Sequence, residues 1–243
     1  MIPYVIINGV SSKNVHGLLI QSLPPITKPK MRTSKEEIDG RNGDLVTTLG
    51  YAAYDKTMTI GLKGDYNVDD VIKYFDTSGK ITFSNEIDKY YNFACYESID
   101  FEKLIRFKTA NVKLHVQPFK YSVDDPPVRV AGQRGSTILN ITALNNGNTT
   151  SRPTLTIKGY GDINVYIGET QILNITLYNQ GGTEGETIII DTEEMNALSP
   201  EGEYMNRRVT GDYDALAFPT GQNTITITGT LNYAQLEKYS RWI

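Results

Sequence analysis

The fold is best predicted from one stretch of the sequence, Gln171-Ile172-Leu173-Asn174-Ile175-Thr176-Leu177-Tyr178. Leu173, Ile175 and Leu177 alternate with Asn174 and Thr176, and a period of two residues is typical of a strand with one buried face. Short runs of the same kind lie on both sides of it, at 137–142, 153–158, 163–167, 187–190 and 224–228. Strands at this spacing predict a β-sandwich of about 90 to 100 residues.

The chain before this region is also rich in strand patterns, and it contains one helix candidate. Strands are expected at 2–7, 15–20, 57–63, 80–84, 90–96 and 111–116, and Asn8-Gly9 closes the first one with a tight turn. The helix begins after Asn67, which can cap it, and its apolar stripe includes Val71 and Phe75. We expect Gly79 to end it. The fold class is therefore mainly β, with one helix in the N-terminal part.

Asp124-Asp125-Pro126-Pro127 is the best candidate for a domain boundary, because consecutive prolines stiffen a linker and interrupt strand pairing. It divides the chain into a first domain, 1–127, and a second, 128–228. The tail, 229–243, holds the only tryptophan, Trp242. Because an exposed tryptophan ring is costly, we expect this tail to pack back onto a folded surface, and the first domain is the candidate for it.

Lys28 to Asp44 is a long polar stretch that contains Pro29, Gly40 and Gly43. Proline and glycine fit poorly in a central strand, so the stretch is expected to form an exposed loop or arm. A connection of this length is usually functional or disordered. Its charged residues are candidates for contacts with a neighbouring subunit: Lys35, Glu36, Glu37, Arg41 and Asp44.

Composition excludes several classes of protein. The formal net charge of −4 gives no electrostatic reason for binding nucleic acid. Cys95 is the only cysteine, which rules out an intrachain disulfide. No apolar run approaches the roughly 18 residues of a membrane helix, and the first residues lack the pattern of a secretory signal. We therefore expect no membrane span, and folding in a cytoplasm.

No motif predicts an enzyme, a cofactor site or a metal site. His16 and His115 are far apart and have no zinc-type spacing, and Gly159-Tyr160-Gly161 precedes a strand instead of a helix. Two groups of carboxylates are candidates for paired acids: Asp191, Glu193 and Glu194 in one, Asp212 and Asp214 in the other. Asp212 and Asp214 are also candidates for calcium ligands. Acidic residues at strand ends are more often solvated, so this interpretation is preferred.

Several local patterns, in order along the chain, resemble those of the distal tail proteins of siphophages and related prophages. The N-terminal patterns are Asn8-Gly9, Gly17-Leu18, Gly40-Arg41-Asn42-Gly43-Asp44 and Gln117-Pro118-Phe119-Lys120-Tyr121. The most specific group is Asn145-Asn146-Gly147, Arg152-Pro153-Thr154-Leu155 and Ile157-Lys158-Gly159-Tyr160-Gly161-Asp162. Ile189-Ile190-Asp191, Phe218-Pro219, Gly221-Gln222-Asn223-Thr224-Ile225 and Arg241-Trp242 complete the order.

The resemblance implies an N-terminal belt domain, a C-terminal galectin-like β-sandwich, and a homo-hexameric ring in the virion tail. Such a ring joins the tail tube protein to the tail tip protein, a fibre or a tail-associated lysin, and carries receptor-binding or baseplate proteins. DNA only passes through it. The alternatives are a carbohydrate-binding module of a host-adhesion device, which would bind cell-surface carbohydrate through tyrosines, and a cell-wall hydrolase, for which the motifs are missing.

Overall fold

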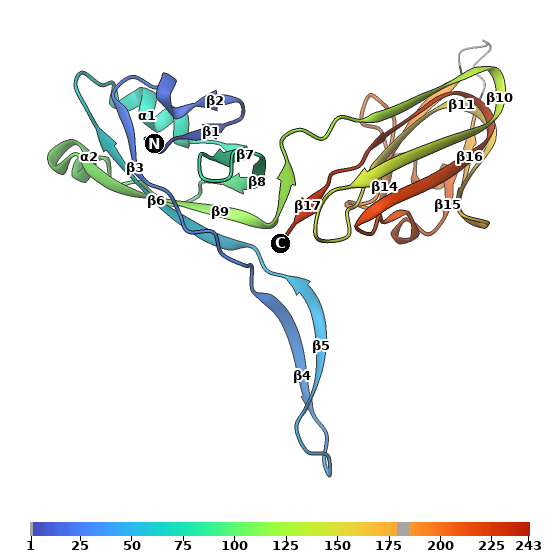
Figure 1. The fold of residues 1–243 in the computed structure, drawn as a ribbon, viewed down its shortest axis with the longest axis horizontal. Coiled ribbons are helices and arrows are strands. Elements are labelled where there is room, and N and C mark those ends of the chain that lie inside the picture. Colours follow the sequence, from blue (N-terminus) through green and yellow to red (C-terminus); the bar gives the residue numbers. More distant parts are fainter. Residues whose placement is uncertain (1, 179–184) are drawn as a thin grey trace. The chain divides into compact units, whose positions relative to one another are not determined.

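A computed structural model describes residues 2–178 and 185–243 of the chain. The chain divides after Val123 into two compact units, and each has its own hydrophobic core. Both units consist chiefly of strands (Figure 1), so the predicted mainly β fold is confirmed.

The main sheet of the first unit is antiparallel and has the strand order β2-β1-β7-β8-β9-β6-β3. Its strands are β1 (Val5–Ile7), β2 (Val10–Ser11), β3 (Leu18–Ser22), β6 (Tyr54–Leu62), β7 (Ser78–Phe83), β8 (Lys89–Ala94) and β9 (Thr109–Ser122). A short 3-10 helix, η1 (Ser12–Asn14), follows β2. The alternation that predicted β6 is confirmed, since Met58, Ile60 and Leu62 are all buried in the core.

The first hairpin shows how local chemistry fixes the register. Asn8 and Gly9 have φ angles of 47° and 83°, and Ile7 pairs with Val10 across them. Positive φ at both central residues is the geometry that an Asn-Gly pair tolerates best in a two-residue hairpin. The tight turn predicted here is confirmed.

The described residues of the first unit form two α-helices, one more than predicted. Helix α1 (Val68–Phe75) begins as predicted, with the side-chain oxygen of Asn67 accepting a hydrogen bond from the amide of Asp69 (3.0 Å). It ends at Phe75 and not at Gly79, which lies in β7 opposite Phe93. Helix α2 (Phe101–Phe107) is shorter and buries only Leu104, too weak a stripe to stand out in the sequence.

The second unit contains eight strands and two 3-10 helices within the described residues. The strands are β10 (Val128–Asn145), β11 (Thr154–Ile167), β12 (Thr170–Leu177), β13 (Glu186–Asp191), β14 (Asn196–Leu198), β15 (Val209–Gly211), β16 (Gly221–Glu237) and β17 (Arg241–Trp242). The 3-10 helices are η2 (Asn206–Arg208) and η3 (Asp214–Leu216). Leu173, Ile175 and Leu177 are buried in β12, which confirms the alternation predicted for this strand.

Three long strands, β10, β11 and β16, contribute to both layers of this unit, which lie on either side of its core. Strand β11 pairs with β13 through residues 154–159 and with β12 through 161–167, while β16 runs along both of its halves. Side chains from the two layers form one hydrophobic core, which includes Ile157 and Ile163 from β11 together with Ile175 and Ile188. The strands predicted separately at 153–158 and 163–167 are thus a single strand, β11, which passes from one layer to the other. It bends where a Cβ on Gly159 would lie 2.4 Å from the carbonyl oxygen of Thr230.

The C-terminal segment differs from its prediction. Residues 229–237 continue β16 in the sheet of the second unit, so the expectation that 229–243 packs back onto the first domain is wrong for this part. The amide of Ser240 donates to Asp125 Oδ2 (2.6 Å), and the amide of Asn148 donates to the carbonyl of Arg241 (3.1 Å). Trp242 is half-buried in β17; the surface on which it docks stays a prediction.

Candidate functional site: an exposed hairpin and a neutralised carboxylate cluster

Strands β4 (Met31–Glu37) and β5 (Asp44–Tyr51) form a separate two-stranded antiparallel sheet, which we call the arm. Figure 1 shows the arm projecting from the main sheet of the first unit. The predicted exposure of this stretch is confirmed, since nearly every residue of both strands is exposed. Of the two predicted forms, a loop or an arm, the structure has the arm: residues 31–37 form a strand, Pro29 precedes it, and Gly40 and Gly43 lie in the tip with positive φ.

The arm is tied to the rest of the unit at its base. The ring of Tyr51 packs edge-on against Phe119, with 5.9 Å between the ring centroids, and the amide of Ala52 donates to the carbonyl of Lys30 (2.8 Å). Beyond this point β4 and β5 pair with each other. A two-stranded hairpin alone is marginally stable in water, so a hairpin of this length is expected to be supported by a partner.

Four of the five predicted arm residues lie in the strands, and the register decides which of them meet. Glu37 is opposite Asp44, and two like charges in this position repel each other. Lys35 lies on the same face, with its ammonium 3.6 Å from Asp44 Oδ2. Glu36 points to the other face, opposite Leu45, and Arg41 is in the tip.

The arm and its tip also carry exposed apolar residues that were not predicted from the sequence. Ile38, Leu45, Val46 and Leu49 are 46%, 39%, 52% and 54% exposed. The signal was present in Leu45-Val46-Thr47-Thr48-Leu49, a run of residues that favour strands immediately after the polar stretch. Exposed apolar residues on an unsupported hairpin are typical of a surface that another protein covers.

A β-bulge near the base sets the course of the arm. Met31 pairs with Tyr51 and Thr33 with Thr48, so Leu49 and Gly50 together oppose Arg32. Gly50 has a φ of 91°, and the guanidinium of Arg32 donates to the carbonyl of Leu49 (3.1 Å). The bulge bends the strand where only glycine adopts the backbone conformation at little cost.

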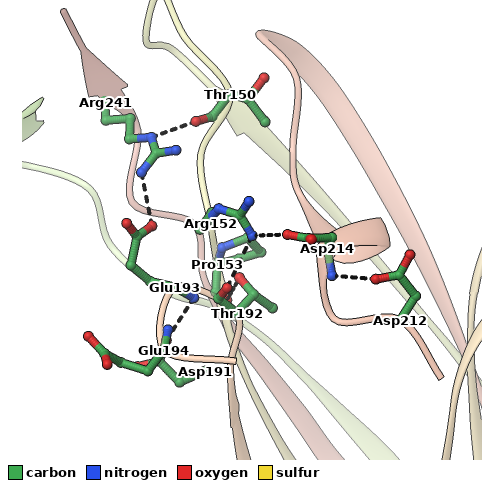
Figure 2. Close-up of polar contacts among 10 residues, drawn as sticks. All are labelled: Thr150, Arg152, Pro153, Asp191, Thr192, Glu193, Glu194, Asp212, Asp214 and Arg241. Atoms are coloured by element: carbon green, nitrogen blue, oxygen red, sulfur yellow. Dashed lines mark hydrogen bonds and ion pairs between the residues drawn. The ribbon is translucent and has the colours of Figure 1, made fainter. Parts of the chain in front are cut away.

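The carboxylates that were candidates for paired acids lie together in the second unit, around two arginines whose role is not apparent in the sequence (Figure 2). Arg152 donates to Asp214 Oδ1 (2.6 Å) and to the carbonyl of Thr192 (3.2 Å). Arg241 donates to Glu193 Oε2 (2.9 Å) and to the carbonyl of Thr150 (2.5 Å).

Two further carboxylates of this cluster, Asp191 and Asp212, stabilise turns. Asp191 accepts hydrogen bonds from the amides of Glu193 and Glu194 (2.9 and 3.0 Å), and Asp212 accepts one from the amide of Asp214 (2.9 Å). These are local side-chain-to-backbone bonds that order a loop. One oxygen each of Asp191, Glu193, Asp212 and Asp214 thus has an arginine or amide partner, an arrangement that serves loop structure.

The described residues include no group of three or more histidine, cysteine or acidic side chains placed to hold a metal ion. In the part of the chain that the structure covers, no helix has the length and apolar character needed to cross a membrane. Cys95 is half-buried, and burial raises the pKa of its thiol. His115 lies in β9 with Nδ1 2.9 Å from Asp55 Oδ1, and the ammonium of Lys113 lies 2.9 Å from the other oxygen of Asp55.

Comparison with solved structures finds the same fold in phage tail proteins. The Dit protein (gp 19.1) of phage SPP1, described as a hub of the adsorption apparatus in phages that infect Gram-positive bacteria, matches 97% of this chain and 98% of its own, with a TM-score of 0.59 and 16% identity. A chain of the phage P2 baseplate, in its activated conformation with Ca, matches 97% of both chains, with a TM-score of 0.51 and 10% identity.

No protein-family model and no curated protein sequence matches the chain. The likeness to the two phage structures covers both units, and it confirms the expected resemblance to distal tail proteins at the level of the fold.

Proposed function

We propose that this chain is a structural tail protein that forms a hexameric hub ring at the distal end of a phage tail tube. The observation that carries the proposal is the correspondence of the whole chain, both units included, with the SPP1 Dit fold. The exposed arm adds independent support, because it supplies a surface that is incomplete in a single copy.

A ring needs two different surfaces on each copy. Head-to-tail contacts are heterologous, and they close into a ring when the rotation between copies divides a full turn. The arm is suited to be one of these surfaces, since it extends from the first unit and exposes Leu45, Val46 and Leu49. Lys35, Glu36, Glu37, Arg41 and Asp44 then set the register of the contact and exclude wrong partners.

The partners follow from the position of such a hub. One side of the ring binds the tail tube protein, and the other binds the tail tip protein, a fibre or a tail-associated lysin. The outer parts carry receptor-binding or baseplate proteins, and DNA passes through the lumen without being held. The protein is located in the virion tail after assembly in the bacterial host cytoplasm. Its role is structural and not enzymatic, in keeping with carboxylates that are engaged by Arg152 and Arg241.

The second domain is proposed to be the galectin-like sandwich, but the structure favours the carbohydrate-binding alternative less than the hub. Its polar cavity of about 320 Å³ is lined by Lys158, Glu186, Ser199 and neighbours, and no aromatic side chain is among the described residues that line it. Arg208 covers one face of the Tyr178 ring at 4.6 Å. A sugar site needs an open aromatic platform beside convergent polar groups.

The ring is tested with the purified full chain by light scattering after size exclusion and by negative-stain electron microscopy. The expected result is a mass of six chains and particles with six-fold symmetry. A shortened arm, with residues 34–47 replaced by Asn-Gly, keeps the Thr33–Thr48 pair and a two-residue turn. This variant is expected to be monomeric, whereas the control Tyr204→Ser, at a side chain 77% exposed in the second unit, stays hexameric. Monomers of the parent chain at high concentration would refute the ring.

A further inference from the structure

The first unit has a surface groove of about 400 Å³ between its first hairpin and helix α1. Its apolar wall is made by Ile7, Val10, Val15 and Tyr74, and its polar rim includes His16, Asp70 and Lys73. An apolar surface with a few polar groups at its edge is the usual composition of a binding site. None of these residues belongs to the arm.

The groove is preformed by contacts between segments far apart in the sequence. The hydroxyl of Tyr74 lies 3.2 Å from the carbonyl oxygen of Val5 and 3.0 Å from that of Val10, which fixes α1 against β1 and β2. Asn8 strengthens this edge, because its side chain accepts a hydrogen bond from the amide of Lys80 (2.8 Å). Val10 nevertheless remains 49% exposed. Covering this rigid wall removes the apolar side chain of Val10 from water at little cost in ordering, so binding here is favourable.

The charged groups at the rim are available to a partner. His16, Asp70 and Lys73 are exposed, and within the described residues their side chains take part in no ion pair or hydrogen bond. A cation and an anion one helical turn apart present charges of both signs along a single edge. The ligand that this edge recognises therefore carries both signs as well.

We propose that this groove receives the tip of the arm from a second copy of the chain. The tip combines the features that the groove requires: Ile38 is 46% exposed, Asp39 can face Lys73, and Arg41 can face Asp70. Leu45 follows on β5 and is 39% exposed. The inference rests on the proposed ring, for which it supplies the second surface of the head-to-tail contact.

The geometry favours a second copy over the chain's own arm. Seven residues of β4 at about 3.3 Å each carry the tip roughly 20 Å beyond the base. Tyr51 against Phe119 fixes the base. Figure 1 shows the tip far from α1 and β2 of the same unit, so the chain's own tip does not reach its own groove.

A cysteine pair tests the contact directly. In a Cys95→Ser background, which removes the only native thiol, Val10→Cys and Ile38→Cys are combined and the full-length protein is oxidised. The expected product on non-reducing gels is a ladder of linked chains that ends at six. The matched control pairs Ile38→Cys with Tyr204→Cys in the second unit and is expected to give no ladder. Rings without a Val10–Ile38 ladder would overturn the inference and leave the ring standing, whereas monomers of the parent chain would refute the ring itself.

A charge reversal gives a second, independent readout. Lys73→Glu is expected to raise the concentration needed for assembly by about tenfold, and adding Asp39→Lys is expected to restore it. Lys63→Glu makes the same charge change at another exposed position of the first unit and is expected to leave assembly unchanged. Equal effects of Lys73→Glu and Lys63→Glu, or no recovery with Asp39→Lys, would contradict the pairing.

Discussion

Individual side chains beneath the start of the arm form a buried charged network in the first unit. Lys56 is only 3% exposed, and its ammonium donates to the carbonyl of Pro25 (2.8 Å), in the segment that leads into the arm. Lys120 and Glu86 form a largely buried ion pair at 2.9 Å, and the hydroxyl of Tyr91 donates to the same glutamate (3.0 Å). Through its bond to Pro25, Lys56 links the segment that leads into the arm to the core.

Burial shifts the pKa values of these groups in opposite directions. It lowers the pKa of Lys56, with Glu86 opposing the shift, and it raises the pKa of Tyr91, where the negative charge of Glu86 adds to the rise. A phenol with a raised pKa contributes stability below its unfolded pKa of about 10, and this contribution is lost as the pH rises above that value.

Tyr91→Phe is therefore expected to change how stability depends on pH. At neutral pH the variant loses about 1 kcal/mol, because Glu86 loses a hydrogen-bond donor. Above about pH 10 the parent chain loses up to about 1.4 kcal/mol per pH unit from this tyrosine, and the variant does not. Urea denaturation at pH 7, 10 and 11 measures the difference. Tyr204→Phe, at an exposed ring, is expected to follow the parent, and parallel pH curves for Tyr91→Phe and parent would disprove the assignment.

At the scale of elements, the arm shows how one residue controls the direction of a whole hairpin. The bulge at Leu49-Gly50 increases the local twist of β5 just beyond the anchored Tyr51. A Cβ on Gly50 would meet only the Arg32 guanidinium, at 3.9 Å, so space is not the constraint there. The constraint is the φ of 91°, which residues other than glycine rarely adopt.

Gly50→Ala is expected to redirect the arm without unfolding the protein. Alanine at this φ costs about 1 to 2 kcal/mol locally, which the hairpin relieves by rearranging the bulge. We expect the concentration needed for ring assembly to rise several-fold, while the melting temperature of the first unit stays within about 2 °C of the parent. Light scattering over a dilution series and calorimetry measure the two effects. Thr48→Ala in the same strand is the control, and unchanged assembly of Gly50→Ala would separate the bulge from ring formation.

At the scale of the whole molecule, the two compact units have separate cores. The first core gathers residues such as Ile60, Phe75 and Leu114, and the second gathers Ile157, Ile175 and Ile227. Asp125 joins the start of the second unit to its C-terminal segment, because it forms an ion pair with Lys238 (2.8 Å) and accepts a hydrogen bond from the amide of Ser240. We propose that the functional boundary lies before Asp124, four residues earlier than the boundary predicted from the prolines.

The second unit is expected to fold by itself if it retains this contact. A fragment of residues 124–243 should unfold in one cooperative transition, and the full chain in two. A fragment of 128–243, cut at the sequence-predicted boundary, lacks Asp125 and should be less stable by about 1 to 3 kcal/mol, since Lys238 then loses its partner. Calorimetry and urea denaturation of both fragments decide this. Equal stability of the two fragments would show that Asp125 is dispensable.

The amino-acid sequence alone predicted the features that depend on a few neighbouring residues. Alternation located most of the strands, Asn8-Gly9 specified a turn, Asn67 capped a helix, and the polar stretch before Asp44 was placed on the surface. These follow from backbone geometry and burial periodicity, which local side chains set. The ordered family patterns added the resemblance that the solved structures confirm as a fold.

The contacts between distant segments, in contrast, can be seen only in the folded chain. Arg152 binds Asp214, 62 residues away, and Tyr74 closes a groove with Val10, 64 residues away. Strand β11 became one bent strand because β16 pairs along both of its halves, and the residues of β11 alone do not encode that pairing. Such contacts depend on hydrogen bonds and shared burial between segments far apart in the chain. For this reason a local pattern located the arm, whereas only the assembled fold shows the groove proposed to receive it.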